Sequence, residues 1–393
     1  MQYLHVIGAF HGLLLAGLLI FGSTTSTASR ILGTWCLFLG LYFLGPFIHL
    51  ERQLNAFSQL IGLHIFLPAS FGAFLYLYCR HAVIDHPLSL KDLLHFLPFI
   101  LCYVLNIELY LSTSEVKLNA ILYGPENLHP ILIAQVILAL QAFIYLGLSM
   151  IMVKRYKNQA EHTLSNYNPE VFSWLWKLLI LNLLIWCIKG FAGLTEYSDM
   201  NSAVSDGLIL VLISSIAMAQ WRNQNLFKID QLKTSVSEYK KDKSDDVKQK
   251  KIQAITKNHV DNKDRSIENS SIENSGALNP SIRSSLLEVV IKHMQSHKTY
   301  LDNQLTLTRL AEAVNISTHH LSEVLNQHEG KNFYQFVNEY RINYICERLK
   351  VDNDIKILDL AMSAGFSSKS TFNAVFKQFM KLTPSQYRKQ LTL

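Results

Sequence analysis

The chain has 393 residues, of which 49% are hydrophobic, and its mean hydropathy is positive at +0.16, which is high for a soluble protein of this size. The formal charge of +6 does not by itself indicate a nucleic-acid partner, because positive loops of a membrane protein give the same total. The five cysteines have no paired spacing, so neither a disulfide framework nor a zinc site is indicated. Composition divides the chain at residues 1–222, 223–280 and 281–393.

Residues 1–222 hold nearly all of the long apolar runs. A helix needs about 20 mostly apolar residues to cross a bilayer, because no water inside the hydrocarbon satisfies its backbone groups. Seven segments meet this requirement, which predicts a polytopic helix bundle in an all-α protein. We expect transmembrane helices at residues 4–22, 31–50, 59–79, 93–111, 131–153, 172–191 and 203–221.

Basic residues are unevenly distributed between the two sets of predicted loops. The loops after odd-numbered helices carry Arg30, Arg80, Lys91, Lys154, Arg155, Lys157, Arg222 and Lys228. The opposite loops carry Arg52 and Lys117. Because cytoplasmic loops are the positive ones, we expect the N-terminus outside and the C-terminus in the cytoplasm. A cleaved signal peptide over residues 1–28 is disfavoured, since its removal would leave six helices and a C-terminus outside.

Four ionisable side chains fall toward the outer ends of the predicted helices: His64, Glu108, Lys189 and Asp206. Burying such groups in hydrocarbon costs several kcal/mol unless they are paired or hydrated. One hypothesis is an outward-facing pocket for a small-molecule or membrane signal, in which Lys189 balances Glu108 or Asp206. The alternative, which stays open, is that all four reach the headgroup region from the helix ends.

Residues 223–280 are rich in lysine, aspartate and serine, and the sequence SIENS occurs twice in tandem between Ser266 and Ser275. Such a composition cannot bury enough surface to offset the entropy of ordering, which predicts a partly disordered cytoplasmic linker. Ile229, Leu232, Val236 and Tyr239 keep a helical spacing, which indicates either that the last predicted span continues into the cytoplasm as a short amphipathic or coiled piece or that these residues lie on a solvated helix face.

Helical periodicity returns after Pro280. Thr306 is suited to cap a short helix over Leu307–Val314, and a tight turn then leads into a second helix over Thr318–His328. This is the pattern of a helix-turn-helix unit, in which the second helix presents its outer face to a partner. The outer face is predicted to carry His319, Ser322, Glu323 and Asn326.

The same pattern recurs about fifty residues later. A short helix begins at Ile357, Gly365 permits the turn, and a second helix covers Ser368–Phe379. One longer helix over Phe333–Leu349 joins the two units. The outer face of the second helix is predicted to carry Lys369, Ser370, Thr371, Asn373 and Lys377.

About the last 110 residues resemble the AraC/XylS family of bacterial transcription regulators, whose DNA-binding domain joins two helix-turn-helix units by a long helix. The resemblance rests on LAEAVNISTHHLSEVL (Leu310–Leu325), AGFSSKSTFNAVFKQF (Ala364–Phe379), and on Gly330, Phe333, Asn338, Arg341, Thr383, Pro384, Tyr387 and Arg388. It does not extend to the membrane half. Lys381 departs from the pattern, because the family usually has glycine there.

The resemblance implies sequence-specific binding of double-stranded DNA through the nine outer-face residues named above. Asn373 is suited to bidentate pairing with adenine, and Lys369 and Lys377 to phosphates or guanine. Glu323 can accept a hydrogen bond from cytosine but repels phosphate, so the second unit is expected to be the stronger reader.

Together these observations predict a transcription regulator in the bacterial inner membrane, with the lipid bilayer and DNA as partners and an unidentified signal. A membrane receptor or transporter whose helix-turn-helix domain binds another protein is the alternative. The sequence contains no HExxH, GxSxG, Walker A or GxGxxG pattern, so we expect no enzyme, cofactor or metal. Homodimer formation is a hypothesis for coupling across the membrane.

Overall fold

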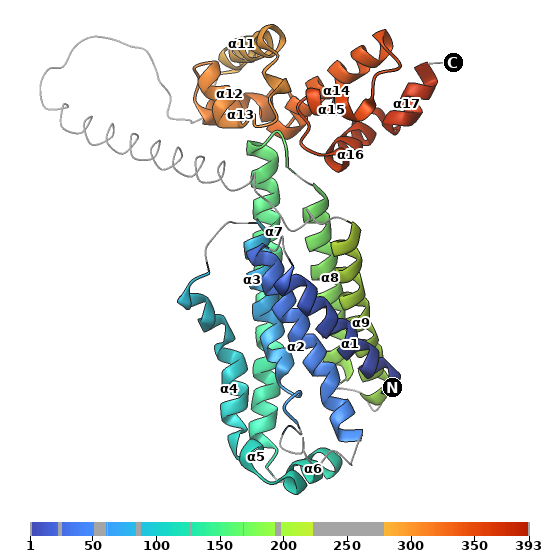
Figure 1. Ribbon diagram of the computed structural model, residues 1–393. Helices are drawn as coiled ribbons and strands as arrows, with labels where there is room; N and C mark the ends of the chain where they lie inside the picture. The colour runs from blue at the N-terminus through green and yellow to red at the C-terminus, as the bar shows by residue number, and fades with distance from the viewer. Residues whose placement is uncertain are drawn as a thin grey trace, which may run out of the picture. The chain divides into compact units, whose positions relative to one another are not determined.

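The computed structural model describes residues 2–22, 26–50, 60, 62–83, 88–125, 127–167, 169–192, 198–222 and 279–391. All of the regular secondary structure in these residues is helical (Figure 1). Two compact units are present, which we call the N-terminal unit (Met1–Arg155 and Val171–Ile229) and the C-terminal unit (Tyr156–Glu170 and Asp230–Leu393). The predicted linker lies outside the described residues, apart from its last two positions.

The N-terminal unit is built from long apolar helices. Of the described helices, α1, α2, α7 and α8 are long and apolar enough to cross a membrane, and the apolar part of α9, Ala203–Ala219, is somewhat shorter. Four of the seven predicted spans therefore lie each within one helix, and a fifth, 4–22, ends one residue beyond α1. The helices are α1 (Gln2–Phe21), α2 (Thr27–Leu50), η2 (Leu67–Ser70), α3 (Phe71–Val83), η3 (Leu90–Phe96), α4 (Leu97–Leu105), α5 (Ile107–Leu111), α6 (Ser114–Tyr123), α7 (His129–Thr163), α8 (Pro169–Ala192) and α9 (Ser198–Arg222).

The third and fourth predicted spans are not single α-helices. In the third, residues 62–66 form turns and a 3₁₀ helix begins at Leu67 with Pro68 near its start, because proline favours the first turn of a helix and not its interior. The fourth is interrupted at buried Asn106, whose side-chain Nδ2 donates to the carbonyl of Cys102 at 2.9 Å. Apolar content alone carries no signal for such interruptions.

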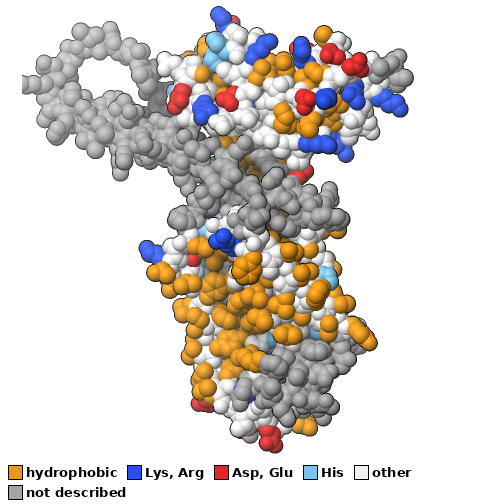
Figure 2. Space-filling model, viewed as in Figure 1, with side chains coloured by type: hydrophobic (Ala, Val, Ile, Leu, Met, Phe, Trp, Pro, Cys, Tyr) orange, Lys and Arg blue, Asp and Glu red, His pale blue; other side chains and the backbone are white. Residues whose placement is uncertain are grey.

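Helix α7 has 35 residues and is much longer than the predicted span over 131–153. At 1.5 Å per residue it extends about 52 Å, whereas the hydrocarbon core of a bilayer is roughly 30 Å thick. Its last turns, from Tyr156 onward, group with the C-terminal unit. On the face drawn in Figure 2, hydrophobic side chains dominate the surface of the N-terminal unit, and charged side chains are concentrated on the C-terminal unit.

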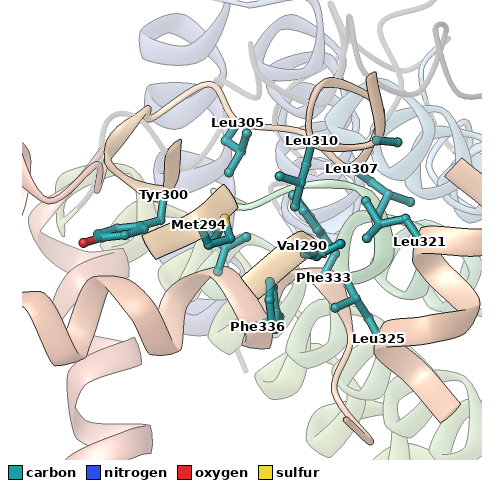
Figure 3. Packing of buried hydrophobic residues seen from close by; sticks show 12 residues of the cluster. Val290, Met294, Tyr300, Leu305, Leu307, Leu310, Leu321, Leu325, Phe333 and Phe336 are labelled. Carbon is teal, nitrogen blue, oxygen red and sulfur yellow. The ribbon is translucent and has the colours of Figure 1, made fainter. Parts of the chain in front are cut away.

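The C-terminal unit contains two helix-turn-helix units joined by one long helix, as predicted. Its core near the first unit is drawn in Figure 3, where Val290 and Met294 pack against Leu310, Leu321 and residues of the long helix. The helices are α11 (Pro280–His297), η4 (Thr299–Leu301), α12 (Leu307–Ala313), α13 (Thr318–Gln327), α14 (Phe333–Val351), α15 (Ile357–Ser363), α16 (Lys369–Met380) and α17 (Pro384–Leu391).

Side-chain caps define the starts of these helices. The predicted cap of α12 is confirmed, because the Thr306 hydroxyl accepts from the amide of Arg309 at 3.2 Å. Ser317 caps α13 through the amide of His320, and Ser368 caps α16 through the amide of Thr371, each at 3.1 Å. Each cap satisfies an amide that has no partner inside its helix, which is why the sequence located these starts within one residue.

Lys381, the departure from the family pattern, ends α16 with a positive φ of 59°. Glycine adopts this left-handed conformation without the steric cost that a Cβ imposes. We expect Lys381→Gly to raise the free energy of unfolding of the C-terminal unit by about 0.5 to 1 kcal/mol, measured by hydrogen exchange of core amides. Lys381→Ala removes the same charge but keeps the Cβ, so an equal gain from alanine would contradict this explanation.

Candidate functional site

The turns of the two helix-turn-helix units have the same backbone geometry. Asn315 and Gly365 hold positive φ values of 56° and 92°. The amide of Ile316 donates to the carbonyl of Ala311 at 3.0 Å, and fifty residues later the amide of Phe366 donates to Ala361 at 3.1 Å. The second helices of both units are therefore presented by the same local structure.

One face of α16 presents a stripe of exposed polar residues. Lys369, Asn373 and Lys377 are spaced four residues apart, and all three are exposed. The opposite face is buried through Phe372, whose ring stacks edge to face against Phe376. Because the aromatic face anchors the helix, the stripe points away from the core. The amide of Asn373 has one positive charge on each side of it, from Lys369 and Lys377.

Ser370 and Thr371 have a different position from the one predicted. Thr371 is 2% exposed, and its hydroxyl accepts from the hydroxyl of Ser368 at 2.9 Å, so it closes the start of α16. Its predicted place on the outer face is wrong, because the N-terminal turn folds back onto its capping residue. Ser370 is half-buried, and its hydroxyl lies 3.3 Å from that of Ser368.

The first unit also presents a polar stripe, on α13. His319 and Asn326 are exposed and Ser322 is half-exposed, as predicted. Asn326 donates to the carbonyl of Ser322 at 2.7 Å, so its amide is oriented within the helix. Glu323 is a correction: it is buried, and its Oε1 lies 3.5 Å from Nε of Arg283 on α11. Helix α11, which precedes the first helix-turn-helix unit, packs against α13 on the side where Glu323 lies.

Arg341 on α14 lies where the two helix-turn-helix units meet. It is fully buried, its Nε donates to the carbonyl of Tyr300 at 2.7 Å and its Nη2 to that of Asp302 at 2.8 Å. Its guanidinium also lies over the ring of Phe366, 5.7 Å from the centroid. Burial lowers the pKa of Arg341 to about 10, so the side chain stays charged at neutral pH. Gly365 packs closely, because a Cβ there would lie 2.7 Å from the carbonyl oxygen of Leu301.

The N-terminal unit contains a polar cluster that joins four helices, in which His5 and Asp206 are buried and Tyr42 and Lys189 are half-buried. Asp206 on α9 accepts from the Tyr42 hydroxyl at 2.9 Å and lies 3.6 Å from Lys189 Nζ, and Lys189 also donates to Tyr42 at 3.1 Å. His5 Nε2 lies 3.5 Å from the other oxygen of Asp206. Asp206 was one of two partners that the sequence offered for Lys189, the other being Glu108, whereas Tyr42 and His5 were missed. The ionisable His5 inside the first predicted span was the available signal.

The other two predicted members of this site have different surroundings. His64 lies beside the cluster, with its ring centroid 6.4 Å from that of Tyr42. Glu108 is exposed in the first turn of α5 and does not join the group. In the part of the chain that the structure describes, no group of three or more His, Cys, Asp or Glu side chains is arranged to hold a metal ion.

The cluster gives a stability prediction. Asp206→Asn leaves the ammonium of Lys189 without its carboxylate, so we expect a loss of about 3 kcal/mol, measured by the thermal unfolding of the detergent-solubilised chain. The double variant Asp206→Leu with Lys189→Met removes both charges and is expected to recover much of that loss. Equal instability of the single and double variants would show that the ion pair is not the cause.

Comparisons with known proteins match this double helix-turn-helix arrangement. A family model described as a helix-turn-helix domain matches residues 310–390. An uncharacterized HTH-type transcriptional regulator of Staphylococcus aureus (strain COL) is 38% identical over 92 residues, which are 23% of this chain and 12% of that protein. The melibiose operon regulatory protein of Escherichia coli (strain K12) is 33% identical over 88 residues, 22% of this chain and 29% of the relative.

Among solved structures, the C-terminal domain of the two-component response regulator yesN from Fusobacterium nucleatum is 24% identical, covers 28% of this chain and 98% of that domain, and has a TM-score of 0.23. The chain spans less than a third of the length of the two regulators, and the residues that the family model matches lie in the C-terminal unit. That unit contains an AraC-type helix-turn-helix domain, as the sequence motifs indicated.

Proposed function

We propose that the chain is a membrane-bound transcription regulator, which binds double-stranded DNA sequence-specifically through α13 and α16. The observation that carries the proposal is the pair of like-built turns, each presenting a second helix with an exposed polar stripe. The proposed domains are a membrane domain over residues 1–222, a cytoplasmic linker over 223–280 and a DNA-binding domain over 281–393. An unidentified signal acts on the membrane domain.

Exposed apolar stripes support the membrane part of the proposal. On α1, Val6, Phe10, Leu14 and Leu18 recur every four residues and are between 47% and 62% exposed. Water would make such a surface costly, whereas lipid does not. The excess of lysine and arginine in the loops after odd-numbered spans favours a cytoplasmic C-terminus in the bacterial inner membrane. The cluster around Asp206 is the proposed region for the signal, and homodimer formation stays a prediction.

Within the DNA-binding surface, the residues have different proposed roles. Asn373 reads adenine, and Lys369 and Lys377 neutralise phosphates on either side of it. His319, Ser322 and Asn326 form the contact of the first unit. Burial removes Glu323 and Thr371 from the set of direct readers, since neither side chain is available to a base edge. Ser370 remains a half-buried candidate.

The proposal is tested by measuring DNA binding of the full chain in lipid nanodiscs at several salt concentrations. Counterion release requires phosphate contacts. We therefore expect the logarithm of the affinity for duplex DNA to fall linearly with the logarithm of the salt concentration. Absence of salt-dependent binding to any duplex would contradict the proposal and favour a helix-turn-helix domain that binds another protein.

A further inference from the structure

The short segment between α7 and α8 is part of the C-terminal unit. In the chain it connects two helices that are apolar enough to span a membrane, yet Tyr156–Glu170 group with the DNA-binding domain. Residues Thr163 to Tyr167, which we call the docking segment, are all buried, and Ser165 is completely so. A loop between two membrane helices is ordinarily solvated, so this burial needs a specific partner.

Ser165 is the centre of the contact. Its carbonyl accepts from Arg341 Nη1 at 3.0 Å and from Asn338 Nδ2 at 3.2 Å, and its hydroxyl accepts from Arg341 Nη2 at 3.1 Å. The same hydroxyl donates to the carbonyl of Leu305, as does the Ser165 amide. Leu164 adds a bridge to Thr306 next to it, so the segment pairs with the backbone that leads into α12.

Asn166 joins the two helix-turn-helix units. Its Nδ2 donates to the carbonyl of Asn303, which precedes the first unit, at 2.9 Å, and to the carbonyl of Gly365, the turn of the second unit, at 2.6 Å. Tyr167 then packs on Tyr334 of α14, with ring centroids 4.4 Å apart. The Asn166 side chain therefore bridges the two helix-turn-helix units at the junction where Arg341 also lies.

The side chains of the DNA-binding domain that contact this segment match it chemically. Among the described residues, Arg341 donates four side-chain hydrogen bonds, of which two go to Ser165, and the acceptors are carbonyl or hydroxyl oxygens. A buried guanidinium needs such acceptors, because hydrogen bonds to charged groups are stronger than neutral ones and costly to lose. Meanwhile Lys369, Asn373 and Lys377 stay exposed, so docking does not cover the proposed DNA-reading stripe of α16.

We propose that the docking segment is an internal brace, which locks the two helix-turn-helix units in one mutual arrangement and couples them to α7 and α8. A braced domain loses less conformational entropy when it binds DNA, so docking raises affinity. A signal that displaces α7 or α8 releases Ser165 and Asn166, and this release lowers the affinity for DNA. This inference rests on the proposed function for its DNA readout, but the docking contact itself does not.

The test uses Asn166→Asp in the full chain, in nanodiscs. This substitution keeps the side-chain volume but faces two carbonyl oxygens with a carboxylate in place of the donating amide. Asn158→Asp is the matched control, because Asn158 is exposed on α7 and carries the same change of charge. Ser165→Ala is a milder second variant, which removes only the hydroxyl.

Hydrogen exchange of the peptide spanning residues 163–167 and affinity for DNA are measured on each chain. We expect slow exchange in the unaltered chain, exchange at least tenfold faster in Asn166→Asp, and DNA affinity at least tenfold weaker in that variant, with Asn158→Asp unchanged and Ser165→Ala intermediate. Fast exchange of this peptide in the unaltered chain overturns docking. Faster exchange of the peptide in Asn166→Asp with unchanged or stronger DNA binding overturns the brace. Failure of the unaltered chain to bind DNA contradicts the proposed function alone.

Discussion

Replacing Arg341 by methionine is expected to lower the free energy of unfolding of the C-terminal unit by about 3 kcal/mol. Methionine fills much of the volume, but it removes the guanidinium that donates to the carbonyls of Tyr300, Asp302 and Ser165. The carbonyls of Asp302 and Ser165 each keep one other donor, the Leu305 amide and the Asn338 side chain, whereas the carbonyl of buried Tyr300 loses the guanidinium donor. Each unsatisfied buried group costs about 1 to 3 kcal/mol. The expected observation is a more than hundredfold faster hydrogen exchange of the core amides of α14 in the full chain.

Arg348→Met is the control for this prediction. Arg348 is on the same helix and loses the same charge, but its side chain is exposed, so a change within about 0.5 kcal/mol is expected. If both variants exchange at the same rate, general loss of charge on α14 explains the result and the buried position of Arg341 has no special weight.

Truncation of Asn373 to alanine is expected to weaken binding to the preferred DNA sequence by about 10- to 100-fold, the effect of losing one bidentate base contact. Binding to unrelated duplexes should change little, because phosphate contacts carry non-specific affinity. The measurement compares both kinds of duplex with the full chain, using sites obtained by genome-wide footprinting. An equal loss on all duplexes would assign Asn373 to the backbone and not to a base.

Lysine variants give the complementary result on the same stripe. Lys369→Ala and Lys377→Ala should each lower the slope of affinity against salt by about 0.9, while sequence preference is retained. Lys292→Ala on α11 is the charge-matched control, since this exposed lysine lies outside both helix-turn-helix units. A slope that falls equally in the control would mean that the whole domain attracts DNA through net charge.

The sequence predicted the C-terminal unit well because local signals determine it. Thr306 and Ser368 cap their helices, and Gly365 has the positive φ that its turn needs. These are interactions between residues a few positions apart, which residue type and spacing reveal directly. The ends of the predicted helices consequently agree with the structure within one or two residues.

Orientation about a helix axis was harder to predict than helix position. Glu323 and Thr371 were expected on outer faces but are buried, one by Arg283 of α11 and the other by its own capping residue Ser368. Both errors come from neighbours that the periodicity of a single helix does not include. Likewise, apolar content predicted continuous spans, whereas the third has turns before the helix that begins near Pro68 and the fourth is interrupted at Asn106.

Contacts between distant parts of the chain were not predictable from sequence. Ser165 and Arg341 are 176 positions apart, and Tyr42 and Asp206 are 164 apart. A serine and an asparagine in a short polar loop have no pattern that distinguishes a docked segment from a solvated one. The docking segment therefore became visible only through its burial and its hydrogen bonds.

The side of the membrane on which the C-terminal unit lies tests the proposed function most directly. Two fusions after the last residue, one to a fluorescent protein that matures in the cytoplasm and one to a phosphatase that is active only outside, report this position in intact bacteria. We expect fluorescence and no phosphatase activity. Phosphatase activity with a dark fluorescent fusion would separate the helix-turn-helix units from the DNA and contradict the proposed function.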